Sequence, residues 1–457
     1  MNGLPQRRQH PGGFRRLAAA FLVAWAAAAG AQETQSVVVA VSEVVRASVA
    51  HSWDLRIAEE QIVAAEAKVT QADAAALPAI DARLQATRYG GLQDVALGSI
   101  LVIPAIEERY SASVGVTQPL YTGGRIAGQK AGAGHQRAAA FQNRRAAQSA
   151  LVLQALTIYW DWSKAFYSVE SLKGAVNRME AHAHDMQNLY KAGMATDNDT
   201  LATDVLSEQT RLRLMESQRR VELARAGIAT LTGTDPAPDA LPAKPETGDE
   251  FSIPPQESAI AAALQRRPEL EASRQEAGAR RSLAKASRSD YFPQVYLSAR
   301  YEQANPNPMM FPPAERWDDD MFAGVTMSWS VLDWGLTRGK AREAESAANQ
   351  AEMRSRLVEE RITLEVRQAR IRFQDAVDRL AVARRIEKSA QRNLDSANDL
   401  WKGGLARHSD VLDALSQLND AQFQLVAAQA DAIVARAEFD YSQGNLAVPD
   451  SAGSASK

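Results

Sequence analysis

Cysteine is absent from the 457-residue sequence. The chain is therefore expected to hold no disulfide, no thiol nucleophile, no cysteine-ligated zinc or iron–sulfur cluster, and no lipid on an N-terminal cysteine. Histidine is scarce, with six residues, so no histidine-based metal site is expected. The sequence also has no large excess of charge of either sign, with 52 Lys and Arg residues and 55 Asp and Glu residues. This balance gives no indication of a basic surface for nucleic acid.

Sequence motifs of common enzyme classes are missing as well. The sequence contains no P-loop, no nucleophile elbow, no HExxH and no GxGxxG. We therefore predict that the protein is not an enzyme and has no catalytic residue, no cofactor and no resident metal. After the N-terminal region, no apolar stretch reaches the ~18 residues of a membrane-spanning helix, which argues against a helical inner-membrane transporter.

The N-terminal region has the three-part layout of a secretory signal peptide. Four arginines precede the apolar run Leu17–Ala29, and Ala29-Gly30-Ala31 matches an A-x-A cleavage site. A membrane anchor is the alternative, but the run is shorter than the ~20 residues that a spanning helix needs. We predict that residues 1–31 are removed on export, so that the mature chain is periplasmic, outer-membrane or released.

The mature sequence contains an internal repeat. The segment Leu189–Ala195 aligns with Leu400–Ala406 at an offset of 211 residues, and the same offset relates Gly124 to Gly335. Farther upstream the offset is 215 residues. The change from 215 to 211 therefore falls within one poorly matching loop in each half. A register held over this distance predicts two structural repeats. We expect them at residues 32–233 and 257–444, joined by a Pro-rich linker at 234–256 and followed by a disordered tail at 445–457.

Each repeat contains two segments in which apolar and polar residues alternate. They form predicted hairpins at about residues 80–121 and 294–332. A period of two predicts strands with one apolar and one polar face, and about 10–12 residues suit a tilted membrane-spanning strand. A soluble sheet is the alternative. Four strands cannot close a membrane barrel, since the smallest have about eight, so strands that span a membrane would require several chains to share one barrel.

Helical sequence flanks each hairpin. Residues 36–77 and 256–290 have helical spacing and end near a proline, which stops a helix. After each hairpin, helical spacing returns and continues to about Leu189 and Leu400, over roughly 60 residues or ~90 Å. The apolar residues recur at a mean spacing near 3.4 residues, which favours a left-handed coiled coil.

Proline and glycine mark the junctions between the hairpins and the long helices. Pro119 cannot donate to a strand ladder and is predicted to end the strand pairing. Glycine relaxes the backbone where a strand turns into a helix, and the junctions contain Gly123, Gly124 and Gly335.

With these features the sequence resembles the TolC family of outer-membrane channel-tunnels. The duplicated plan carries the likeness, together with the junction QPLYTGGR (Gln118–Arg125) and the segment GLARHSDVLDAL (Gly404–Leu415). The resemblance implies a mainly α fold with a transmembrane β-hairpin pair. In a homotrimer, twelve strands would form one β-barrel in outer-membrane lipid, continuous with a long α-helical barrel that extends into the periplasm. The implied partners are a periplasmic adaptor (membrane fusion protein) and an inner-membrane ABC or proton-driven pump.

The resemblance also points to residues at the periplasmic turns. Asp410 and Asp413 match the family positions that form carboxylate rings at the pore constriction. They lie three apart and so share a helix face; Ser409 or Asp410 could also cap the helix, a role that is compatible with the favoured pore role. Asp199 is the first-repeat equivalent, with a capping role at least as well supported. The turns themselves contain Gly193, Gly404 and Arg407; where some family members have a basic gate residue, this sequence has Ala406 with Arg407 beside it.

Other side chains near these turns are assigned packing roles. Tyr190 and Trp401 are predicted to pack rather than gate, and His182 and His184, two apart, do not share a helix face for a metal. Three functions remain open. An outer-membrane exit duct for type I protein secretion is favoured, because no cysteine is available for lipidation. A multidrug efflux channel and a soluble periplasmic coiled-coil adaptor are the alternatives.

Overall fold

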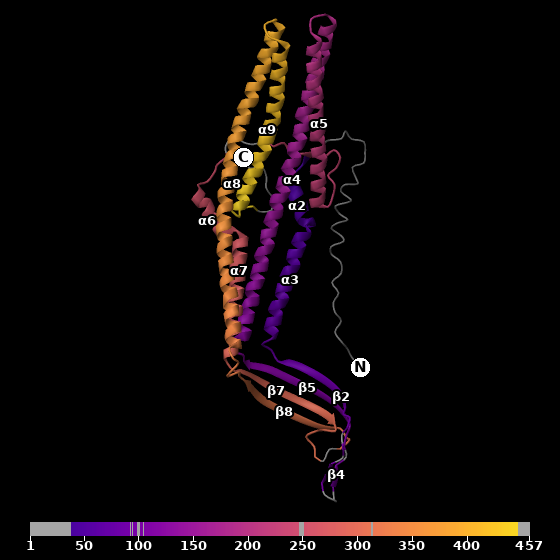
Figure 1. The fold of residues 1–457 in the computed structure, drawn as a ribbon, viewed down its shortest axis with the longest axis vertical. Coiled ribbons are helices and arrows are strands. Elements are labelled where there is room, and N and C mark those ends of the chain that lie inside the picture. Colours follow the sequence, from indigo (N-terminus) through magenta and orange to yellow (C-terminus); the bar gives the residue numbers. More distant parts are fainter. Residues whose placement is uncertain are drawn as a thin grey trace.

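The computed structural model describes residues 38–91, 93, 95–97, 101–103, 105–245, 251–311 and 314–446. The predicted signal peptide (residues 1–31) lies outside the described residues, as do residues 246–250 of the linker and 447–457 of the predicted tail. The described chain is elongated, with long helices running along its length and a small sheet at one end (Figure 1).

The two repeats share the order of two helices, two long strands, a long helix and a final helix, and they differ in the short strands β3 and β4 and in the turn η1. The first contains α2 (Val41–His51), α3 (Trp53–Ala74), β2 (Ala79–Arg88), β3 (Val95–Leu97), β4 (Leu101–Ile103), β5 (Glu108–Tyr121), α4 (Arg125–Lys191) and α5 (Asp197–Thr232). The second contains α6 (Gln256–Arg266), α7 (Pro268–Ser287), the 3-10 turn η1 (Arg288–Tyr291), β7 (Gln294–Asn305), β8 (Asp318–Ser328), α8 (Leu336–Lys402) and α9 (His408–Ser442). Helices α4 and α8 each have 67 residues, or about 100 Å, so the predicted long helices are confirmed.

The helix that was predicted to precede each hairpin is instead two helices. The break falls at Ser52 in the first repeat, where the Ser52 hydroxyl accepts a hydrogen bond from Leu55 N at 3.3 Å and caps α3. In the second repeat it falls at Arg267, whose extended backbone (φ −65°, ψ 116°) precedes Pro268. A residue before proline is disfavoured in the α conformation, which gives the physical reason for this break.

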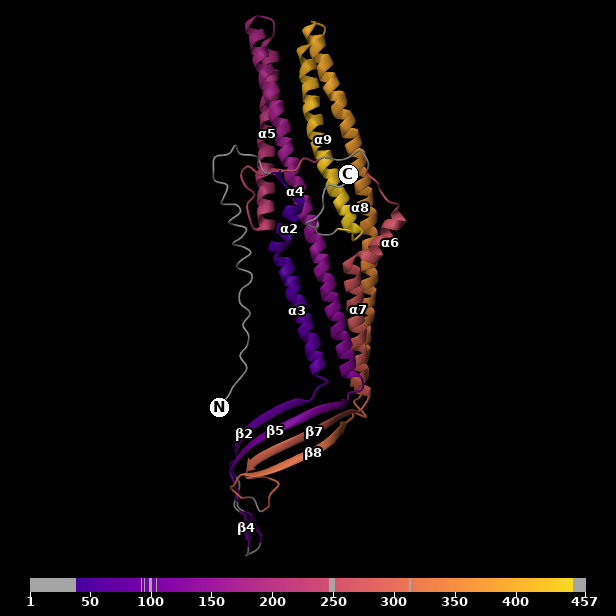
Figure 2. The same ribbon diagram turned by 180° about the vertical axis from the view of Figure 1, so that it is seen from behind.

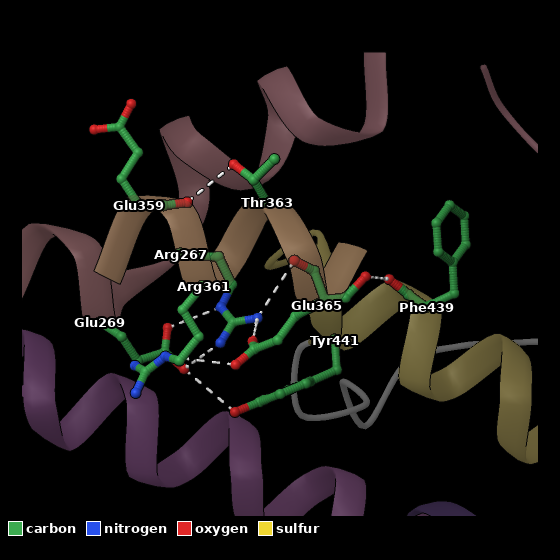
Figure 3. A network of polar contacts seen from close by, with 9 residues as sticks. Arg267, Glu269, Glu359, Arg361, Thr363, Glu365, Phe439 and Tyr441 are labelled. Carbon is green, nitrogen blue, oxygen red and sulfur yellow. Dashed lines mark hydrogen bonds and ion pairs between the residues drawn. The ribbon is translucent and has the colours of Figure 1, made fainter. Parts of the chain in front are cut away.

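Arg267 is buried at this break and is held by a polar network (Figure 3). Its guanidinium forms ion pairs of 3.0 Å with both Glu269 and Glu365, and it lies 4.9 Å over the ring of Tyr441. Tyr441 in turn donates a hydrogen bond to Glu269 at 3.2 Å. The network ties the α6–α7 break to α8 and α9, halfway along the molecule.

The long helices pair into two antiparallel coils, which end side by side (Figure 1, Figure 2). We call the α4–α5 pair the first coil and the α8–α9 pair the second coil. The heptad-like stripe predicted from the sequence lies mostly inside, with Trp162, Met179, Phe373 and Leu380 among its buried members. Tyr190, at the end of the stripe, is an exception and is exposed.

The Pro-rich linker packs against the first coil rather than spanning free space. β6 (Leu241–Pro242) pairs in parallel with β1 (Val38–Val39). The buried Tyr159 of α4 holds both strands, because its hydroxyl donates to Val39 O at 2.7 Å and accepts from Ala243 N at 2.8 Å. These contacts fix the described start of the linker to α4.

Four strands from both repeats form one antiparallel sheet in the order β2-β5-β7-β8. The predicted hairpins are therefore adjacent, joined through β5 and β7. The sequence placed the second hairpin's end near residue 332, but β8 ends at Ser328 and the following residues lead into α8. The short β3–β4 hairpin, between β2 and β5, was not predicted.

Candidate functional site

The sheet separates apolar from polar side chains over most of its area, with Phe322 as an exception on the polar face and Gln303 and Asp319 as exceptions in the row of Leu84. Directly paired residues in an antiparallel sheet lie on the same face. One face therefore carries rows such as Ile80–Val116–Ala299–Ala323 and Ala82–Val114–Tyr301–Met321. The opposite face carries Asp81–Gly115–Arg300–Phe322 and Arg83–Ser113–Glu302–Asp320. The alternation predicted for separate strands thus becomes one apolar and one polar surface.

Among the residues that the structure describes, none covers the apolar face. Leu84 is 88% exposed and Met321 is 80% exposed, although both are large and apolar. An apolar surface of this extent needs a covering of lipid or protein. On the polar face, oppositely charged side chains pair across strands, as in the 3.2 Å ion pair between Arg109 and Glu302.

Strands β2 and β8 form the two edges of the sheet, and neither edge is paired within the described chain. Unpaired edges present free backbone N–H and C=O groups that readily pair with another chain. The sheet is therefore open, and strands of another chain can pair with either of its edge strands.

The turn from the sheet into each long helix uses a left-handed glycine, at the positions where glycine was predicted to relax the backbone. Gly124 (φ 89°) and Gly335 (φ 92°) are the N-caps of α4 and α8. The residue before each is left-handed too, but here the repeats differ: Gly123 (φ 58°) corresponds to Trp334 (φ 54°). A Cβ on Gly123 would lie 2.7 Å from the carbonyl oxygen of Ser289, whereas Trp334 is 91% exposed and meets no such obstacle.

Pro119 does not end the strand, contrary to the prediction. β5 loses its partner β2 after Thr117 but continues beside β7, with Pro119 opposite Tyr296 and an irregularity between Pro119 and Tyr121. Proline lacks only the N–H donor, and a bulge tolerates that loss. At the junction, β5 therefore continues with β7 as its one remaining partner in the sheet.

The far ends of the two coils have closely matching turns. In the first coil, Gly193 (φ 73°) donates to Tyr190 O and Met194 donates to Leu189 O. In the second coil, the equivalent residues make the same bonds: Gly404 (φ 71°) donates to Trp401 O and Leu405 donates to Leu400 O. This is the Schellman motif, in which a left-handed glycine satisfies the last carbonyls of a helix.

Asp199 helps to cap the N-terminus of α5, the helix that follows the turn of the first coil. Its carboxylate accepts hydrogen bonds from Thr196 N at 3.0 Å and Thr196 Oγ1 at 2.7 Å, while Thr196 Oγ1 accepts from Asp199 N at 3.3 Å. This reciprocal pair is a capping box. The hydrogen bonds from the Thr196 side chain and backbone lower the pKa of Asp199, because they favour its charged form.

Asp410 makes half of the same arrangement in the second coil. Its carboxylate accepts a hydrogen bond from Arg407 N at 2.9 Å, but the arginine side chain has no acceptor to return one. Asp410 and Asp413 are both exposed on the outer face of the first turns of α9, whereas Val411 and Leu412 beside them are buried. The two carboxylates therefore share a solvent-facing surface at the turn, as the sequence spacing predicted.

Polar side chains link the first coil to the second. Arg178 of α4 donates to Asn419 Oδ1 at 2.7 Å and to Gln422 Oε1 at 3.2 Å, both on α9. Burial lowers the pKa of Arg178, because its charged form loses water. Two exposed ion pairs run between the same coils: Arg213–Asp420 at 2.5 Å and Lys164–Asp431 at 2.8 Å. A groove of about 280 Å³ lies between α4, α5 and α9 beside these links.

A ring cluster near the turns was missed by sequence reasoning. His182 of α4 stacks on His408, the first residue of α9, with ring centroids 4.6 Å apart and an interplanar angle of 24°. Trp401 of α8 lies 6.2 Å from each ring, which confirms its predicted packing role. His182 and His408 are 226 residues apart and are not repeat equivalents, so no sequence pattern pairs them.

Two kinds of feature are absent from the part of the chain that the structure describes. No three His, Cys, Asp or Glu side chains there are grouped so that they could hold a metal ion. Among the helices described above, none combines the length and the apolar composition that crossing a membrane requires.

Comparison with known proteins gives consistent matches over both repeats. The family model described as outer membrane efflux protein matches residues 44–234 and 259–444. Outer membrane protein OprJ of Pseudomonas aeruginosa is 24% identical over 359 residues, which cover 74% of this chain and 71% of OprJ. The toluene efflux pump outer membrane protein TtgC of Pseudomonas putida is 24% identical over 397 residues, which cover 85% of this chain and 78% of TtgC.

The fold likewise matches a solved structure. The outer-membrane channel OprN superposes with a TM-score of 0.77 at 21% sequence identity, covering 89% of this chain and 90% of OprN.

Proposed function

This chain belongs to the outer membrane efflux protein family, and from that premise we propose that it forms a homotrimeric exit duct for small molecules. In the proposed assembly, three sheets join edge to edge into one twelve-stranded barrel in the outer membrane. The coils of the three chains surround a tunnel that extends into the periplasm. The duct itself performs no chemistry.

The two-faced open sheet is the observation that carries this proposal. Strands β2, β8 and β7 have 10, 11 and 12 residues, close to the ~9–11 that cross a bilayer when tilted. The apolar face would contact lipid and the polar face would line water, which is the arrangement of outer-membrane barrels. Edges β2 and β8 cannot remain unpaired in hydrocarbon, so each would pair with a neighbouring chain.

Crosslinking between edges tests the assembly. The chain has no cysteine, so one cysteine fixed in β2 and a second scanned along β8 introduce the only thiols. At the matching register we expect oxidation to give covalent trimers in outer-membrane fractions. If every β2–β8 pair stayed monomeric under denaturing electrophoresis, the shared barrel would be ruled out.

The proposed cargo is small apolar and amphipathic molecules. Support comes from TtgC, whose name describes toluene efflux, and from the family description. Type I protein secretion, which was favoured from the sequence, stays the alternative. Deletion in the native host separates the two: sensitivity to solvents and drugs with normal protein secretion supports small-molecule efflux, and the reverse supports type I secretion.

The proposed partners are a periplasmic adaptor and an inner-membrane pump, either an ABC or a proton-driven one. They would supply the energy and load the cargo, while this chain provides the path across the outer membrane. Copurification from solubilised membranes, with the adaptor crosslinked in living cells, tests this part of the proposal.

We also propose that Asp410 and Asp413 line the narrow end of the tunnel. Three copies would place six carboxylates around the axis, and such rings attract cations. In planar bilayers, D410N with D413N is expected to weaken block by a trivalent cation at least tenfold, because the negative charge is lost. Asparagine at 410 retains an acceptor for the Arg407 N–H, so the cap persists.

D395N, which neutralises an exposed carboxylate of α8 farther from the turn, is the control and should leave the block unchanged. Equal block in the native and double-variant channels would remove the carboxylate ring from the proposal and leave Asp410 as a helix cap.

A further inference from the structure

The stacked pair His182–His408 joins the first coil to the second near their turns. His182 belongs to α4 and His408 begins α9, and the rings lie 4.6 Å apart. The Oγ1 of Thr203, on α5, is 3.0 Å from His408 Nε2. With Trp401 of α8 beside both rings, all four long helices contribute to one cluster.

The cluster is built for uncharged rings. His182 Nε2 and His408 Nδ1 are buried and have no hydrogen-bond partner. Burial, together with the neighbouring His408, lowers the pKa of His182 to about 4, and burial also lowers the pKa of His408. Two carboxylates oppose these shifts: Asp185 of α4 acts on His182, and Asp199 of α5 acts on His408. From α8 the contact is the uncharged ring of Trp401.

We propose that His182 and His408 form a proton-operated latch between the two coils, closed while both rings are neutral and released when acid charges them. Two imidazolium rings at this separation would repel each other, and each would carry a buried N–H without an acceptor. Moving the coils apart would return both rings to water. The latch within one chain is inferred from the contact between the two rings. Its effect on transport rests on the proposed function.

The direction with pH follows from proton linkage. The latched form holds His182 with a pKa near 4, whereas a solvated histidine titrates near 6.5. The latched form thus binds fewer protons, so its stability is complete above pH 6.5 and is lost progressively as the pH falls toward 4. Between pH 7.5 and pH 5, His182 alone would shift the ratio of latched to released forms by about 30-fold toward release.

The distance between the two turns tests the latch directly. Met194 and Leu405 are exposed, at 76% and 80%, so M194C and L405C can carry spin labels in an otherwise cysteine-free chain. Full-length chains reconstituted with an excess of unlabelled chains give one labelled protomer per assembly. We expect the distance distribution between the labels to lengthen and broaden between pH 7.5 and pH 5.

H182Q should remove most of this response, because one of the two charges can no longer form. H182F serves if glutamine does not pack, since it keeps a flat ring without a proton. The matched control is H184Q, two residues along the same helix on the exposed side, which should respond like the native chain. An unchanged distance at pH 5 in the native chain, or an equal response in H182Q, would overturn the latch.

Conductance in planar bilayers gives the second measurement. If the latch gates the duct, acid should raise the open probability in the native chain and the H184Q control but not in H182Q. A pH-dependent distance without any conductance would retain the latch and contradict the proposed duct, so the two failures can be told apart.

Discussion

Single residues explain why the two repeats are not interchangeable. Both strand–helix junctions need two left-handed residues in succession, but only the first repeat uses glycine at both. Gly123 lies against the backbone of Ser289, whereas its counterpart Trp334 faces open space. The glycine is thus required by a close approach between the repeats, and the tryptophan bears the cost of a left-handed backbone without that constraint.

Exchanging side chains at these positions should have unequal effects. G123A adds a Cβ that would meet the Ser289 carbonyl and also strains the backbone, so we expect a loss of about 1–3 kcal/mol in stability. W334G removes strain and only exposed surface, so it should be neutral or slightly stabilising. The temperature at which the assembly dissociates, followed by electrophoresis, measures both; equal shifts would contradict this account.

Among the helices, polar side chains add to apolar packing where the two coils meet. Within the second coil the turn end is packed by apolar residues such as Leu394, Val411 and Leu415. Between the coils, hydrogen bonds and ion pairs such as those of Arg178 and Arg213 stand beside apolar contacts, because Met179 of α4 and Leu206 of α5 pack against the same cluster. The contacts between the coils therefore include buried links and exposed links, whose strengths can be compared by mutation.

The buried and exposed links should contribute unequally. R178A leaves Asn419 and Gln422 without their donor in a partly buried position, and we expect a cost of about 1–3 kcal/mol and a higher open probability of the duct. R213A breaks a pair whose side chains are about half exposed, which is worth about 0–1 kcal/mol. Thermal dissociation and bilayer recordings of the two variants would show whether burial decides the effect.

The positions of helices and strands were predicted well where the periodicity of apolar residues is sustained. They were predicted poorly where a single residue interrupts a helix. The two long helices and the glycines at the junctions followed from spacing and composition, whereas the full length of 67 residues and the left-handed backbone came from the structure. The breaks at Ser52 and Arg267 were missed because helical periodicity continues across them. The second was still readable from Pro268, since proline disfavours a helical residue before it.

At the scale of the whole molecule, the sheet faces decide how the chain meets its surroundings. Family membership confirms the outer-membrane location predicted from the sequence. Val114 and Ser113 are neighbours on β5, in apolar and polar rows respectively. They make a matched pair for testing which face meets lipid.

V114R should prevent membrane assembly, because arginine at the bilayer midplane costs about 2–4 kcal/mol in each chain. S113R places the same side chain toward water and should still assemble. The yield of heat-dissociable oligomer in outer-membrane fractions measures the difference. Comparable yields for both variants would mean that the apolar row does not face lipid.

Local order was decided by the sequence itself, because each of its signals acts over a few residues. Alternation with a period of two specified two-faced strands, heptad-like spacing specified long paired helices, and duplication required both repeats to fold alike. Contacts between distant segments were decided only by the tertiary structure. Packing of separate helices and strands placed β5 beside β7, aligned the apolar rows of four strands and stacked His182 on His408, and no local pattern encodes which distant residues will meet.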